Sequence, residues 1–282
     1  MDLLHFFVLA FAGSVFAGAL GALLGLGGGI IVVPMLTLLM GVDIHYAIGA
    51  SIVSVIATSS GAAAAYIRDG LTNRRVGLLL ETATTAGAVT GAFAAAIVAP
   101  QALYLLFSVI VGYSALAMFR KRRADISLGV VNHPWSERLG LAGAYPNASR
   151  GGMTPYAVAG VPLALLLMYI AGIVSGLLGI GSGVLKVPAM DLVMRLPIKV
   201  SSATSNFMIG VTAVASAGIY FARGDIVPIV AAPVAIGVLL GAAVGARALM
   251  RARSTLIRQT FVLVLVVVAL QMAAKGVGWH VV

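Results

Sequence analysis

The segment LGLGGGIIVVP at residues 24–34 returns as LGIGSGVLKVP at residues 178–188. Both copies place spaced glycines, an apolar run and a proline in the same order, 154 positions apart. The same offset matches Ser51 with Ser205, Thr58 with Thr212 and Tyr66 with Tyr220. The pattern predicts two structural repeats, each containing a helix that is broken at a glycine cluster.

The composition indicates a membrane protein. Of the 282 residues, 61% are hydrophobic and 9% are charged, and the mean hydropathy is +1.10. A soluble core cannot bury that much apolar surface. The net charge of +10 would suggest nucleic acid as a partner of a soluble protein, but in a membrane protein basic residues mark the cytoplasmic loops, so no nucleic acid is expected.

The absence of cysteine and the scattered positions of the histidines argue against several kinds of catalytic and metal site. The chain has no cysteine, which excludes thiol catalysis and zinc–thiolate sites. The four histidines, residues 5, 45, 133 and 280, are too scattered to suggest metal-ligand spacing. We therefore expect no metal and no cofactor.

The apolar segments predict an all-α polytopic membrane protein with about eight full spans and two short broken or re-entrant segments. A helix needs roughly 20 apolar residues to cross a bilayer. The runs at residues 30–40 and 184–194 are too short to cross as helices. An extended glycine segment followed by a short helix can just cross, and a re-entrant hairpin is the alternative. The predicted full spans are residues 3–24, 44–67, 76–98, 102–119, 156–178, 201–222, 226–250 and 256–274.

Three regions follow from these spans. Residues 1–119 form a first transmembrane repeat, residues 120–154 a polar, basic cytoplasmic linker, and residues 155–282 a second transmembrane repeat. The first span resembles a signal peptide, but it lacks a positively charged start and its repeat counterpart lies in mid-chain. We therefore expect it to be retained.

The distribution of charge favours inverted repeats. If each broken segment crosses, each half has five crossings, and Arg223 and Lys275 alone fall opposite the other basic loop residues. If the broken segments do not cross, Arg195, Lys199 and the basic cluster at residues 247–258 change sides. The positive-inside rule favours the first arrangement, in the cell membrane, with the basic loops in the cytoplasm.

A family resemblance rests on the paired glycine segments, the stretch ATSNFMIG at residues 203–210, and the two-half layout. Together they resemble the sulfite exporter TauE/SafE family, also called TSUP, over nearly the whole chain except the linker. The resemblance implies a secondary transporter of small organic or sulfur-containing anions such as sulfite, sulfonates or sulfoacetate. We expect the transport to be coupled to a proton or ion gradient. One departure is Ser182, which stands where the first glycine cluster has Gly28.

The glycine clusters also suggest an anion site by their chemistry. Non-helical backbone at membrane depth must line a cavity or lie buried in protein. The helices that begin after the clusters present free N–H groups and the positive end of the helix dipole, which suit an anion. The alternative is that the glycines only permit close helix packing. The substrate-binding candidates in the clusters are Gly27, Gly28, Gly29, Gly181, Ser182 and Gly183.

Lys186 lies inside the second apolar run, where a charge is costly and usually faces a partner, a substrate or water. Its repeat counterpart is Val32, so the shared fold does not require it. We expect it to act as the counter-charge for the anion. The alternatives are a lysine that reaches the membrane surface, or one that pairs with Asp191 or Glu81.

Two carboxylates are candidates for ion coupling, Glu81 and Asp191. The repeat counterpart of Glu81 is Ala235. Glu81 can serve as a proton-coupling carboxylate, or it can be an interfacial residue that answers the charges of Arg74 and Arg75.

Small polar side chains supply further candidate contacts, namely Ser51, Thr204, Ser205 and Asn206. Hydroxyls and amides can donate to oxyanions without adding charge. Serine and threonine in membrane helices also bond back to their own backbone, which is the alternative reading.

The sequence lacks the motifs of the enzyme classes considered. Neither GxSxG nor HExxH occurs, so we expect no enzyme. An anion channel without ion coupling remains the alternative, because inverted repeats with half-helices also build pores. The sequence leaves the oligomeric state open and is compatible with a homo-oligomer.

Overall fold

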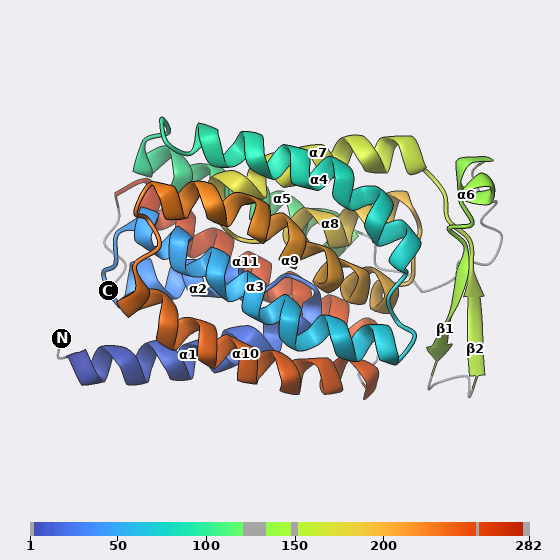
Figure 1. The fold of residues 1–282 in the computed structure, drawn as a ribbon, viewed down its shortest axis with the longest axis horizontal. Helices are drawn as coiled ribbons and strands as arrows, with labels where there is room; N and C mark the ends of the chain where they lie inside the picture. Colours follow the sequence, from blue (N-terminus) through green and yellow to red (C-terminus); the bar gives the residue numbers. More distant parts are fainter. Residues whose placement is uncertain (1–2, 121–133, 148–151, 252–253, 279–282) are drawn as a thin grey trace.

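The computed structural model describes residues 3–120, 134–147, 152–251 and 254–278. Its long helices lie side by side in a bundle (Figure 1). Seven described helices are long and apolar enough to cross a membrane, and α5 is an eighth long helix. The prediction of an all-α polytopic membrane protein with about eight spans is confirmed. The long helices are α1 (Leu3–Leu24), α3 (Ile44–Arg68), α4 (Arg74–Ala94), α5 (Pro100–Arg120), α7 (Val161–Leu178), α9 (Ile198–Ala222), α10 (Pro228–Arg251) and α11 (Ser254–Gly276).

The two predicted short segments are also present. α2 (Gly29–Pro34) continues as the π-helix η1 (Met35–Leu39), and α8 (Gly183–Pro188) continues as the π-helix η2 (Ala189–Val193). Proline has no N–H to donate into the helix ladder, and in both segments the wider π spacing begins directly after the proline. Each broken helix thus continues as a short α-helix followed by a short π-helix.

The repeat holds at the level of whole elements. The first and last residues of α2, η1 and α3 recur 154 positions later as those of α8, η2 and α9. The first residues of α4 and α5 recur in the same way in α10 and α11. The internal similarity of the sequence therefore reports a duplicated structure.

The two repeats run in opposite directions. Gly49, near the start of α3, lies against the backbone of Asp225, just beyond the end of α9. Asn73, just beyond the end of α3, donates its backbone N–H to Thr204 Oγ1 near the start of α9, at 3.0 Å. α3 and α9 are thus antiparallel, as inverted repeats require.

Glycine packing joins the two repeats twice, in equivalent ways. α1 packs on α10, and its counterpart α7 packs on α4. Gly241 of α10 lies against the Val15 carbonyl, and its counterpart Gly87 of α4 lies against the Tyr169 carbonyl. At both positions a side chain would overlap the neighbouring backbone, so the GxxxG glycines outside the broken segments serve close helix packing.

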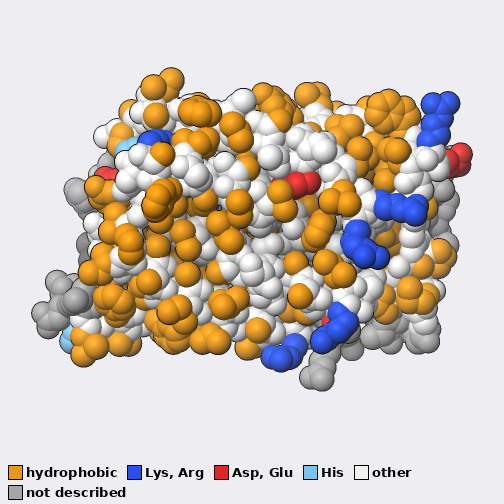
Figure 2. Space-filling model, viewed as in Figure 1, with side chains coloured by type: hydrophobic (Ala, Val, Ile, Leu, Met, Phe, Trp, Pro, Cys, Tyr) orange, Lys and Arg blue, Asp and Glu red, His pale blue; other side chains and the backbone are white. Residues whose placement is uncertain are grey.

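The two ends of the molecule differ in charge. Both chain termini lie at one end, and a β-hairpin lies at the other (Figure 1). Most of the lysine and arginine side chains visible on one face, though not all of them, lie toward the hairpin end (Figure 2). Arg75 belongs to this end, since its guanidinium donates to the Gly140 carbonyl at 3.0 Å.

Part of the linker is ordered in a way that the sequence did not suggest. It contains the short helix α6 (Pro134–Arg138) and the antiparallel strands β1 (Gly143–Asn147) and β2 (Gly152–Tyr156). The Asn73 amide fastens this unit to the bundle, because Nδ2 donates to the Leu141 carbonyl at 2.7 Å and to the Tyr156 hydroxyl at 3.0 Å. Burial raises the pKa of the Tyr156 phenol, so this hydroxyl stays neutral.

Candidate functional site

The loops that break the helices have matching backbone shapes. Gly25 and Gly27 have φ of 74° and 70°, and their counterparts Gly179 and Gly181 have φ of 63° and 61°. Other residue types rarely adopt this left-handed region. The glycines are therefore needed to reverse the chain between α1 and α2, and between α7 and α8.

The two loops meet inside the bundle. Ser51 Oγ donates to the Gly179 carbonyl at 2.6 Å, and its counterpart Ser205 Oγ donates to the Gly25 carbonyl at 2.6 Å. Gly183 lies directly against the Gly25 carbonyl. Each repeat thus satisfies the carbonyl at the broken end of the other.

The place where the two glycine loops meet, which we call the loop crossing, is closed to solvent. Residues 24–30 and 178–184 are all buried, so a solute reaches the loops only when parts of the protein move. A groove of about 420 Å³ between α1, α2, η1 and α11 is lined by apolar residues and by Gln271, and it contains none of the candidate residues. That groove does not identify the functional site.

Several predicted contacts are used to hold the end of α1. Asn206 Nδ2 donates to the Ala22 carbonyl at 2.7 Å, and the Tyr66 hydroxyl donates to the same carbonyl at 2.9 Å. Thr204 Oγ1 accepts from the Asn73 backbone. Asn206 and Tyr66 thereby satisfy a carbonyl near the broken end of α1, whereas Thr204 holds the turn between α3 and α4. Among the described residues, Asn206 Oδ1 is buried without a hydrogen-bond partner.

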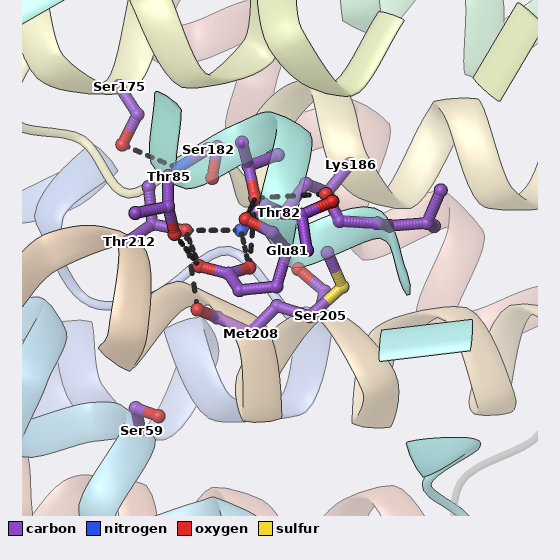
Figure 3. Close-up of polar contacts among 12 residues, drawn as sticks. Ser59, Glu81, Thr82, Thr85, Ser175, Ser182, Lys186, Ser205, Met208 and Thr212 are labelled. Atoms are coloured by element: carbon purple, nitrogen blue, oxygen red, sulfur yellow. Dashed lines mark hydrogen bonds and ion pairs between the residues drawn. The ribbon is translucent and has the colours of Figure 1, made fainter. Parts of the chain in front are cut away.

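Lys186 lies in a buried polar cluster between α8, α4 and α9 (Figure 3). Its side chain is 0% exposed. The ammonium lies 3.1 Å from Glu81 Oε2 and 2.6 Å from Thr212 Oγ1, and Thr212 Oγ1 donates to Glu81 Oε1 at 2.6 Å. The three side chains form a closed triangle that joins the two repeats.

Two further threonines complete the surroundings of Glu81. Thr84 Oγ1 donates to Oε2 at 2.9 Å, and Thr85 Oγ1 donates to Oε1 at 3.1 Å. Glu81 is 7% exposed and takes Lys186 as its charged partner. The interfacial placement considered for Glu81, beside Arg74 and Arg75, is therefore wrong. The reason is that α4 turns this carboxylate toward α9 rather than along the surface.

The threonines of this cluster are not among the site residues predicted from the sequence. Thr84 and Thr85 lie three and four residues after Glu81, which places them on the same helix face. That spacing could have predicted that both threonines contact Glu81. The role of Thr212 was not readable, since it depends on how α9 packs against α4 and α8.

Asp191, the other candidate carboxylate, lies in η2 and is buried, with 2% of its surface exposed. It comes five residues after Lys186 on the same broken segment. Of the two candidate carboxylates, Glu81 is the one that forms the ion pair with Lys186.

The repeats use equivalent residues differently here. Thr58 Oγ1 accepts from the Gly28 N–H at 3.1 Å. At the equivalent place in the second repeat, the Ser182 N–H donates instead to Ser175 Oγ at 3.0 Å. Thr212, the counterpart of Thr58, is therefore available to Lys186 and Glu81.

Ser182 also has unused hydrogen-bonding capacity. Its residue is 1% exposed, and within the described part of the chain Ser182 Oγ has no hydrogen-bond partner. A buried hydroxyl without a partner costs free energy unless something else satisfies it. It lies four residues, about one helical turn, before Lys186.

Comparison with known proteins agrees with this architecture. The sulfite exporter TauE/SafE family matches residues 10–272. A probable membrane transporter protein of Bacillus subtilis, YunE, is 27% identical over 278 residues, which cover 96% of this chain and 98% of the relative. A probable membrane transporter protein of Xylella fastidiosa is 28% identical over 263 residues, covering 92% and 91%.

A second Bacillus subtilis protein, the probable membrane transporter protein YdhB, is 25% identical over 230 residues, covering 82% of this chain and 85% of the relative. No solved structure is significantly similar to this chain. The family and the relatives indicate membrane transport rather than enzymatic activity. With eight long helices, two crossing loops and a family match over most of its length, the chain belongs to the sulfite exporter TauE/SafE family.

Proposed function

We propose that this protein is a secondary transporter of small organic or sulfur-containing anions, of the sulfite, sulfonate or sulfoacetate class. It works across the cytoplasmic membrane by alternating access, with its basic loops in the cytoplasm, and it couples to a proton or ion gradient. The observation that carries the proposal is Lys186, a fully buried cation on a broken helix one turn from the loop crossing.

The chemistry around Lys186 favours an anion. Among the described residues, Ser182 Oγ has no hydrogen-bond partner, and a hydroxyl can donate to an oxyanion. The first amides of the two short helices, at Gly29, Ile30 and Val184, have no acceptor within their own helix. Glycine at the crossing lets a ligand approach the backbone closely.

The other candidate residues divide by how their polar atoms are used. We assign substrate contact to Lys186 and to the glycine-loop residues Gly27, Gly28, Gly29, Gly181, Ser182 and Gly183. We assign Ser51, Ser205 and Asn206 to the frame that holds the loops, because they already bond to backbone at the broken ends of α1 and α7. We assign Thr204 to the turn between α3 and α4, where it accepts from the Asn73 backbone.

The burial of the site supports alternating access. The loop crossing and Lys186 are closed to both ends of the bundle in this structure. A substrate therefore enters only after one part of the bundle moves against another, and the inverted repeats offer two related ways of opening.

The test is uptake into proteoliposomes across a panel of sulfite, methanesulfonate, sulfoacetate, acetate and phosphate. We expect saturable uptake and counterflow for one or more sulfur-containing anions. Lys186→Ala should weaken affinity by about ten- to a hundredfold, the loss of one charged hydrogen bond. Lys275→Ala, which removes a lysine from the last turn of α11, is the control. Unchanged affinity in Lys186→Ala would reject the assigned site, and flux without saturation or counterflow would favour an anion channel.

A further inference from the structure

We propose that Glu81 and the transported anion are alternate partners of Lys186. Each monovalent anion would then bind together with one proton on Glu81, and the transport step would move no net charge. The inference rests on the proposed function and specifies its coupling ion as the proton.

The geometry makes Lys186 the shared partner. An ammonium has three N–H donors. Within the described part of the chain, two of them are used, one on Glu81 Oε2 and one on Thr212 Oγ1. One donor is left for an incoming oxyanion while the lysine stays in place.

Charge then decides which combinations can exist. The pair of Lys186 and ionised Glu81 is neutral, and both side chains are buried, with that of Lys186 0% and that of Glu81 9% exposed. Adding an anion to the ionised pair leaves one uncompensated negative charge in a low-dielectric interior, which is strongly unfavourable. A proton on Glu81 restores neutrality. When the anion leaves, Lys186 again needs Glu81 in its ionised form.

The threonines can hold Glu81 in either form. The hydroxyls of Thr84, Thr85 and Thr212 donate to the ionised carboxylate. A hydroxyl is both donor and acceptor. When the carboxyl is protonated, Thr212 can accept its O–H and keep its place between Glu81 and Lys186. The proton comes from water on the side to which the site opens, and it leaves to water on the other side.

The elements packed around the pair carry further titratable groups in their sequences. α4 begins with Arg74 and Arg75, and Arg75 bonds to Gly140. α7 carries one titratable side chain, Tyr169. α9 carries Lys199, Tyr220 and no acid, and Lys199 comes thirteen residues before Thr212. η2 carries Asp191, and α5, which packs on α8, carries Tyr104, Tyr113 and Arg120.

The experiment uses the full chain in proteoliposomes with methanesulfonate as the probe. A sulfonate stays monovalent at every pH used, so any proton that moves is carried by the protein. Internal pH is followed with a trapped dye, anion uptake with labelled probe, and current on a solid-supported membrane. We expect one proton taken up per methanesulfonate, uptake driven by an inward proton gradient, and no current. Net current, or uptake without protons, would overturn the inference.

Variants separate the coupling from transport itself. Glu81→Gln imitates the protonated form, so it should retain methanesulfonate counterflow while losing proton uptake and pH dependence. Glu137→Gln, at an exposed acid of α6, is the matched control and should behave like the wild type. Proton uptake that persists in Glu81→Gln would overturn the inference while leaving transport intact. If Glu81→Gln does not fold, the wild-type proton count and current still decide. Failure of the wild type to move any anion of the panel would reject the proposed function, and this inference with it.

Discussion

The hydroxyl of Ser51 donates a 2.6 Å hydrogen bond to the carbonyl of Gly179, which joins α3 of the first repeat to the broken helix of the second. At the equivalent place in the other repeat, the Ser205 hydroxyl donates to the Gly25 carbonyl. Two loops that each lack a complete helical ladder therefore stabilise one another across the repeat boundary.

The first prediction concerns these two bonds. Ser51→Ala and Ser205→Ala should each destabilise the protein by about 1–3 kcal/mol, because each leaves a buried carbonyl without its partner. Thermal unfolding in detergent measures the effect. Ser60→Ala is the control, since Ser60 is exposed and bonds to Ile56 of its own helix. If the buried serines cost no more than Ser60, the loops do not depend on these bonds.

The second prediction concerns the contact between the loops. A Cβ at Gly183 would overlap the Gly25 carbonyl oxygen and lie 2.7 Å from Leu26 Cα. Gly183→Ala should therefore force the loops apart and lower both folded yield and anion uptake. Gly218→Ala is the matched change, because a Cβ on Gly218 in α9 meets nothing within 4 Å. It should be neutral or slightly stabilising, by up to about 1 kcal/mol. Equal behaviour of the two variants would contradict the observed crossing.

The third prediction concerns the buried ion pair. Lys186→Met or Glu81→Gln alone should each cost stability, by about 3–5 kcal/mol where a charge is left unpaired. The double variant should recover part of that loss, because it leaves no buried charge. A double-mutant cycle of unfolding free energies gives the coupling. Additive effects of the two changes would mean that the pair does not form in the folded protein.

The fourth prediction concerns orientation in the membrane. The chain has no cysteine, so single cysteines can be introduced and labelled without background. Positions 75 and 247 should react from the cytoplasmic face, and positions 223 and 275 from the opposite face. Labelling of positions 75 and 247 from different faces would reject the inverted arrangement.

The sequence predicted the architecture because its decisive features are local. Apolar run lengths set the number of long helices, and glycine spacing at residues 25–29 and 179–183 marked the breaks. The fixed offset between the repeats predicted which elements correspond. The strand pair Gly143–Asn147 and Gly152–Tyr156 was missed because strands of five residues in a polar linker carry little pattern.

The candidate site was harder to predict because its polar groups depend on long-range packing. Ser51 and Lys186 are both buried polar residues on broken or adjoining helices, yet one bonds to backbone and the other to a carboxylate. Nothing local distinguishes these uses. The partner of Lys186 lies 105 positions away in the sequence. Residue types alone could not decide whether that partner is Glu81 or Asp191.

The single ion pair has a consequence for the origin of the chain. The counterpart of Lys186 is Val32, and the counterpart of Glu81 is Ala235. A homodimer built from one repeat would carry either two such pairs or none, since both subunits would be identical. One pair can be present only after the repeat had been duplicated and its two copies had diverged. Duplication thus supplied the scaffold, and divergence assigned the charged chemistry to one half of it.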